Sequence, residues 1–134
     1  MMLKKALLGM ACCGLWTATT GAATGPGPQP LTIPLAGQRG SMDLLTGAPQ
    51  TAGMRSGFVR LRPGETVGWH TTGRHEETLV ILHGKGAALV EGQPRREFAA
   101  PAVAYIPPDT RHNIENTGTG ALEYVYVVAP AAAR

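Results

Sequence analysis

The chain has 134 residues and a formal net charge of +3, a length that suits one domain rather than two. Lys4 and Lys5 account for two of its twelve basic residues, and the other ten nearly balance nine Asp and Glu residues. This even charge argues against a nucleic-acid-binding protein, which gathers Lys and Arg on one face. Eighteen Gly and eleven Pro residues imply many turns and, with short runs of Val, Ile and Thr, predict an all-β fold.

Residues 1–23 have the pattern of an export signal. Two lysines precede an apolar stretch that is too short to span a membrane, and small residues end the segment. The pattern predicts a periplasmic or secreted protein. Both cysteines, Cys12 and Cys13, lie in the apolar stretch, so the alternative is a lipoprotein that is held at a membrane by an acylated cysteine. In either case the folded part has no cysteine, and therefore no disulfide and no thiolate metal site.

The rest of the chain divides into a flexible leader over 24–30, a single β domain over 31–130 and a tail over 131–134. Within the domain, short segments of β-forming residues are separated by Gly and Pro turns. The expected strands, in chain order, are 31–35, 41–45, 55–61, 66–70, 76–82, 87–91, 96–98, 102–106, 111–115 and 122–128. No long segment has a helical period, so strands of this length and spacing predict a sandwich or a small barrel.

Three polar side chains are predicted to meet inside this barrel. His70 and Glu77 belong to the polar stretch 64–84, and if its two strands pair as a hairpin, both side chains converge on the inner face. His112 points inward from a third expected strand. Two imidazoles and a carboxylate on one face suit Fe(II), Mn(II), Zn(II), Ni(II) or Cu(II), and the sequence does not choose among them.

Other polar and aromatic residues have two interpretations each. His75 has the same parity as Glu77, so it is either a fourth ligand or a loop histidine. Glu76 is expected to face the opposite side, toward solvent, and His83 is expected to be exposed or structural. The tyrosines either line a cavity or pack in the core, and they are Tyr105, Tyr124 and Tyr126.

The polar stretch resembles the first motif of the cupin superfamily. That motif is Gly, five residues, His, one residue, His, three or four residues, Glu, six residues, Gly. Gly64, His70, Glu77 and Gly84 fit its spacing. Thr72 stands where the second histidine would be, which is a departure from the pattern.

The downstream histidine matches the second cupin motif, which is Gly, five residues, Pro, one residue, Gly, two residues, His, three residues, Asn. Pro107, His112 and Asn116 fit at the right spacing. Pro101 and Asp109 replace the two glycines.

The resemblance covers about residues 31–128 and implies a small single-domain bacterial cupin. Its fold would be a jelly-roll β-barrel of short antiparallel strands. The resemblance also implies that His70, Glu77 and His112 are metal ligands. A threonine hydroxyl is a poor ligand, so His75 is the candidate for the position that Thr72 leaves open.

Two classes of function follow from this reading. One is a metal-dependent enzyme, such as an oxygenase, isomerase or lyase, that acts on a small organic molecule, with no catalytic residue assigned. The alternative is a non-catalytic module that binds a small ligand or a metal ion. A homodimer is compatible with both, because one outward strand face is apolar enough to pair with another sheet, namely Thr78, Val80 and Leu82.

Overall fold

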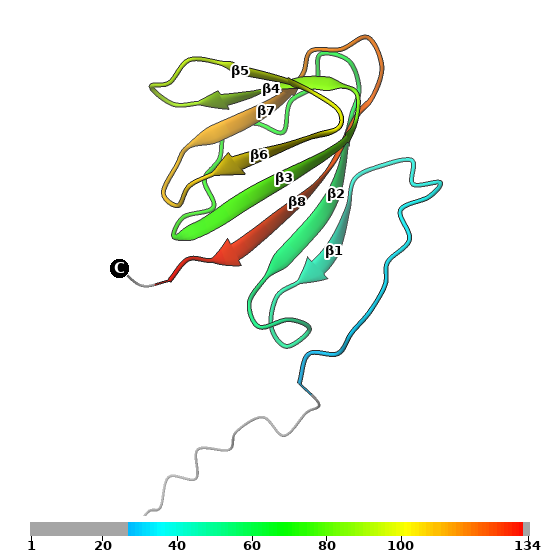
Figure 1. The fold of residues 1–134 in the computed structure, drawn as a ribbon, viewed down its shortest axis with the longest axis vertical. Coiled ribbons are helices and arrows are strands. Elements are labelled where there is room, and N and C mark those ends of the chain that lie inside the picture. The colour runs from blue at the N-terminus through cyan, green and yellow to red at the C-terminus, as the bar shows by residue number, and fades with distance from the viewer. Residues whose placement is uncertain (1–26, 133–134) are drawn as a thin grey trace, which may run out of the picture.

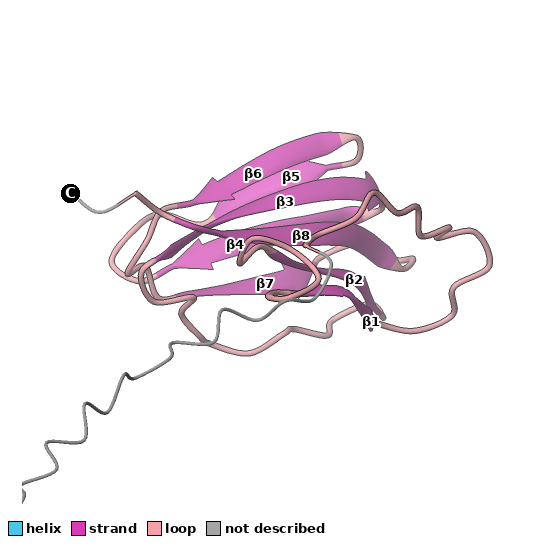
Figure 2. Ribbon diagram, turned by 90° about the horizontal axis from the view of Figure 1, so that it is seen from below, coloured by secondary structure: helices cyan, strands magenta, loops and turns pink. Residues whose placement is uncertain are grey.

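The structure is a computed structural model that describes residues 27–132. Strands and loops, with no helix, make up this part of the chain (Figures 1 and 2). Its strands are β1 (Met42–Thr46), β2 (Arg55–Leu61), β3 (His75–His83), β4 (Lys85–Val90), β5 (Arg96–Ala99), β6 (Ala102–Ile106), β7 (His112–Asn116) and β8 (Leu122–Pro130). Residues 27–132 thus contain no helix able to cross a membrane, and the predicted export signal, 1–23, lies outside the described residues.

The strands form two antiparallel sheets. The larger has the order β1-β2-β8-β3-β6 and the smaller has the order β5-β4-β7 (Figure 1). Some neighbours, such as β1 and β2, are consecutive in sequence, whereas β8 lies between β2 and β3. This two-sheet architecture confirms the predicted all-β jelly roll.

Eight of the ten expected strands are present. Two have the predicted bounds, Arg55–Leu61 and Ala102–Ile106, and the others differ by one or two residues at either end. The expected strand at 31–35 is wrong, because this segment pairs with no other strand. Pro30 and Pro34 lack the N–H groups that strand pairing needs, which accounts for the irregular backbone.

The expected strand at 66–70 is also wrong, as is its predicted hairpin with the next strand. Gly68 has a φ of 86°, which breaks the extended backbone between two isolated bridges. One bridge joins Thr66 to Glu115 and the other joins His70 to His112. The segment therefore runs along β7 of the smaller sheet rather than along β3.

The core lies between the sheets and is built by strict alternation along β3. Glu77, Leu79 and Ile81 are buried, while Val80 and Leu82 on the other face are exposed. Burial of each large aliphatic side chain stabilises the fold by about 1.5–3 kcal/mol. The inner face of β3 thus contributes Leu79 and Ile81 to the core. Near the start of the strand, the same face buries the carboxylate of Glu77.

Gly84 carries the chain from one sheet to the other. It has a φ of 88°, and a Cβ at this position would lie 2.3 Å from the carbonyl oxygen of Ala121. The strands on either side of Gly84, β3 and β4, belong to different sheets and do not pair as a hairpin. Only glycine meets both the backbone angle and the close approach.

Asn116 ties the end of β7 to the rest of the domain. Its buried side chain donates hydrogen bonds to the carbonyl oxygens of Leu61 at 2.9 Å and Gly120 at 2.8 Å. Its side-chain oxygen Oδ1 accepts a hydrogen bond from the Gly118 N–H at 2.9 Å. These three bonds join the end of β7 in the smaller sheet to the end of β2 and to the loop before β8.

Candidate metal centre

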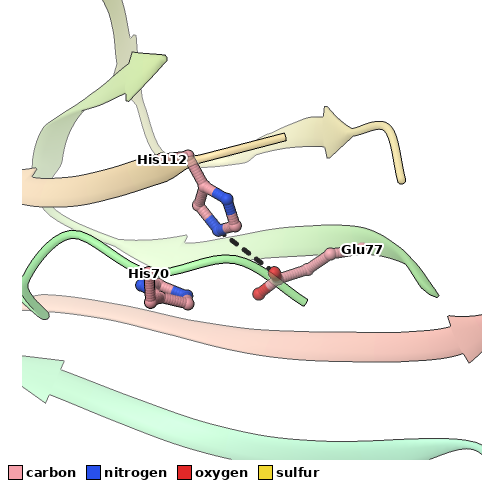
Figure 3. A group of neighbouring side chains, drawn as sticks. All are labelled: His70, Glu77 and His112. Carbon is pink, nitrogen blue, oxygen red and sulfur yellow. Dashed lines mark ion pairs between the residues drawn. The ribbon is translucent and has the colours of Figure 1, made fainter. Parts of the chain in front are cut away.

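Three side chains from three separate segments meet inside the barrel (Figure 3). His70 comes from the loop before β3, Glu77 from β3 and His112 from the start of β7. Each offers one donor atom, and these atoms all lie within 4.8 Å of one another. Glu77 and His112 are buried, whereas His70 is exposed. The convergence predicted for these three residues is thus present, although His70 reaches it through its bridge to β7.

Backbone carbonyls hold both imidazoles in one tautomer. The Nδ1 of His112 lies 3.0 Å from the carbonyl oxygen of Thr110, and the Nδ1 of His70 lies 2.9 Å from that of Gly68. A carbonyl oxygen only accepts hydrogen bonds, so each Nδ1 carries the proton. The Nε2 lone pair of each neutral ring is then available to a metal, the arrangement typical of metal-binding histidines.

The buried part of the group contains polar atoms whose hydrogen bonding is not satisfied within the described part of the chain. Glu77 Oε2 and His112 Nε2 lie 3.2 Å apart, yet neither has a well-aligned hydrogen bond among the described residues. Leaving such an atom buried and unpaired costs about 1–3 kcal/mol. A bound cation would give both atoms a partner. Two imidazole nitrogens and a carboxylate oxygen are a donor set that fits a divalent transition metal.

Electrostatics couple the same two residues. Burial is the largest single influence on His112, and it lowers the pKa of the imidazole. Contacts with Glu77 and with the Thr110 carbonyl, together with the charge of Glu77, outweigh burial. The net effect raises the pKa of His112 above its usual value. In the metal-free protein Glu77 therefore favours a proton on His112, so proton and metal compete for the same nitrogen.

His75 does not join this group of three. Its Nδ1 lies 3.1 Å from the carbonyl oxygen of Thr72, and the Thr72 hydroxyl donates to the carbonyl oxygen of His75 at 3.1 Å. The loop between them is tied down by a hydrogen bond from the Asp109 N–H to the Gly73 carbonyl. A ligand role for His75 stays a prediction. His83, expected to be exposed or structural, is exposed.

A cavity of about 570 Å³ opens beside the three donors. Tyr124 and Tyr126 line it, and Tyr124 also belongs to the core. Tyr105 lies instead on the outer face, where its hydroxyl donates to Glu76 at 3.1 Å. His70 and Glu77 line the cavity together with apolar side chains and three threonines, namely Leu45, Val59, Val67, Ile114, Val128, Thr46, Thr71 and Thr72. This volume is in the range of small-molecule sites.

Sequence reasoning missed two charged residues of this cavity. Asp43 on β1 and Arg55 on β2 both line it, although they lie outside the two motifs. Arg55 shares a strand face with Gly57 and Val59, so alternation alone could have placed it inward. No sequence pattern indicated that β1 and β2 border the cavity.

The comparison with protein families agrees with this geometry. The model of the cupin domain family matches residues 57–128, so the chain belongs to the cupin family. The match spans β2 to β8 and includes all three donor residues. No curated protein has significant sequence similarity to the chain.

Solved structures share the fold at low sequence identity. A protein from Bacillus halodurans is 21% identical with a TM-score of 0.67, and the match covers 81% of this chain and 86% of that one. A Cupin 2 conserved barrel domain protein from Salinispora arenicola is 24% identical, with a TM-score of 0.59 and coverage of 68% and 75%. The cupin domain of Cnp3 from Schizosaccharomyces pombe is 20% identical, with a TM-score of 0.61. That match covers 68% of this chain and 64% of the chain solved for the Cnp3 cupin domain.

Proposed function

We propose that this cupin binds a divalent transition metal through His70, Glu77 and His112 and uses it to act on a small organic molecule. One observation carries the proposal: two Nε2 lone pairs and a buried carboxylate oxygen without a well-aligned hydrogen bond converge beside a cavity. A metal bound there would act as a Lewis acid or would hold oxygen or water. Two histidines and one carboxylate leave further coordination positions for such ligands.

The chain's own residues around the cavity favour chemistry on a small molecule. Burial, followed by the negative charge of Glu77, raises the pKa of Tyr124, so its hydroxyl keeps its proton and can donate a hydrogen bond to a ligand. Apolar side chains such as Val59 and Val128 share the wall with polar ones, and they offer a surface for the hydrocarbon part of a ligand. An oxygenase, isomerase or lyase is the reaction class that this setting supports.

A non-catalytic binding module is the alternative, and Thr72 favours it. The hydroxyl of Thr72 donates to the His75 carbonyl and stands at the position where the cupin motif has a histidine. A site with three protein donors binds metal more weakly than one with four, which would suit a protein that only captures a metal or a ligand.

Elemental analysis of the purified protein tests metal binding. We expect about one transition metal ion per chain, lost in His112→Ala and retained in His83→Ala, because His83 is exposed and lies outside the group. Absence of stoichiometric metal, together with no heat of binding on titration with divalent ions, would refute the proposal. Thermal-shift hits from a panel of small acids and sugars, assayed for turnover, then separate the enzyme from the binding module.

We also propose that the protein is exported to the periplasm or the medium. The basis is the pattern of residues 1–23, a basic start, a short apolar stretch and small residues. Amino-terminal sequencing of the protein from its host should begin after residue 23. A lipid-modified Cys12 or Cys13 would support the lipoprotein form, and an uncleaved, unmodified chain would refute export.

A homodimer through the outer face of the larger sheet is a further part of the proposal. Val80 and Leu82 on β3 are exposed, and Val103 on the neighbouring edge strand β6 is 70% exposed. Exposed apolar side chains gathered on one sheet favour association. Light scattering should give a dimer mass for the wild type and a monomer for Val103→Lys, with Thr119→Lys as the control. A monomeric wild type at 100 µM, roughly the concentration at which weak dimers form, would refute it.

A further inference from the structure

Arg55 brings an unpaired positive charge to the cavity that holds the proposed metal site. It begins β2 and lines the cavity, and none of the described residues forms a hydrogen bond or an ion pair with its side chain. By contrast, Arg60 pairs with Glu123 and Arg111 pairs with Glu91. A guanidinium that lines a cavity without a partner has its donors available to a ligand.

The acidic residue that could neutralise Arg55 is engaged elsewhere. Asp43 accepts a hydrogen bond from the Tyr126 hydroxyl at 3.2 Å and forms no ion pair with Arg55 within the described part of the chain. Gly57 makes the Tyr126 contact possible, because a Cβ there would lie 2.4 Å from the tyrosine ring and 2.6 Å from its hydroxyl. The glycine thus lets the ring cross β2 and reach Asp43 on β1.

Charge around the cavity favours an anion once the metal is bound. Arg55 and a divalent metal contribute three positive charges, and Asp43 and Glu77 contribute two negative ones. Guanidinium groups bind carboxylates through two parallel, charge-assisted hydrogen bonds. Apolar side chains in the same lining, among them Val59 and Val128, suit a short hydrocarbon chain.

We infer that the cavity binds a small organic carboxylate, with its carboxylate group on Arg55 and a second oxygen directed to the His70, Glu77 and His112 group. The contact with Arg55 stands on the geometry of the cavity alone, and the second contact rests on the proposed metal function. Tyr126 is a positioning residue in this arrangement, because it keeps Asp43 away from the guanidinium. Arg55 and its surroundings therefore define the substrate class as an anion rather than a sugar or a neutral alcohol.

Calorimetric titration with matched charged and neutral probes tests this inference. The probes are malonate, succinate and glutarate, each compared with its diamide, and the protein is used with added Mn(II) and again after removal of metal by dialysis against a chelator. We expect at least one dicarboxylate to bind about tenfold or more tightly than its diamide, since charge-assisted hydrogen bonds exceed neutral ones.

Substitutions assign that preference to Arg55. Arg55→Gln should reduce dicarboxylate affinity about tenfold or more. Arg39→Gln should leave it unchanged, because Arg39 is exposed and lies outside the cavity. Asp43→Asn should increase the affinity. Tyr126→Phe should decrease it, because Asp43 is then free to pair with Arg55. Circular dichroism of each variant checks that the fold is retained.

Three results would overturn the inference. They are equal binding of acids and diamides, full dicarboxylate affinity in Arg55→Gln, and no binding of any dicarboxylate at 10 mM, which is roughly the weakest affinity that a specific site shows. Failure of the metal proposal gives a different result. If the wild type binds no metal but still prefers dicarboxylates through Arg55, the anion site stands and the metal function fails. If it binds metal and Arg55→Gln has no effect on any probe, the metal function stands and the anion site fails.

Discussion

Replacement of His70 by alanine separates metal binding from folding. The His70 side chain is exposed, and its contacts are a hydrogen bond to the Gly68 carbonyl at 2.9 Å and a tilted ring contact with His112 at 4.3 Å between centroids. The backbone bridge between His70 and His112 does not need the side chain. We therefore expect His70→Ala to cost the metal-free protein about 1 kcal/mol or less of unfolding free energy.

The metal-bound protein should respond much more strongly. A metal at one hundred times its Kd stabilises the wild-type fold by about 2.7 kcal/mol, which raises Tm by about 10–20 °C for a domain of this size. Loss of one of three ligands should weaken binding by about 100-fold or more, since even residues behind the ligands contribute 10–100-fold. At the same metal concentration the stabilisation then falls to about 0.4 kcal/mol.

Differential scanning calorimetry with and without metal measures both effects. His70→Ala should lose most of the metal-induced increase in Tm but little of its metal-free stability. His83→Ala is the matched control, because it removes an exposed histidine outside the group and should keep the full increase. A full metal-induced increase in His70→Ala would refute the assignment of His70 as a ligand.

Two further predictions concern pH and stability. Because contact with Glu77 raises the pKa of His112 despite burial, the protonated pair stabilises the metal-free fold below about pH 6.5, the unfolded-state value, and this contribution is lost as pH rises through the folded-state pKa. Metal affinity should instead increase with pH, since the metal needs the neutral imidazole. Urea unfolding and metal titration from pH 5 to 8 check the two slopes, and parallel trends would contradict this account. Asn116→Ala removes three hydrogen bonds and should cost about 3 kcal/mol in urea unfolding, against less than about 0.5 kcal/mol for the exposed control Thr119→Ala. A loss below about 1 kcal/mol in Asn116→Ala would show that these bonds contribute little.

Strand alternation made most of the architecture predictable. Two strands have the bounds expected from the sequence, and Leu79 and Ile81 are buried on the face that alternation assigns to them. The failures occurred where backbone chemistry interrupts an apparently regular pattern. Pro34 removes a donor in one case, and Gly68 adopts a positive φ in the other. Both residues are visible in the sequence, but their effect depends on the strand that would have paired with them.

By itself, the sequence determined the fold class and which three residues converge. The spacing within the two motifs is a local property, and alternation along β3 gives Glu77 the same inward face as Leu79 and Ile81. Tertiary structure alone decided how they meet. His70 reaches His112 through a bridge to β7 in the smaller sheet, a contact between residues that are distant along the chain. It also decided that Asp43 and Arg55 border the same cavity. Their placement depends on the register of β1, β2 and β8, which long-range packing sets.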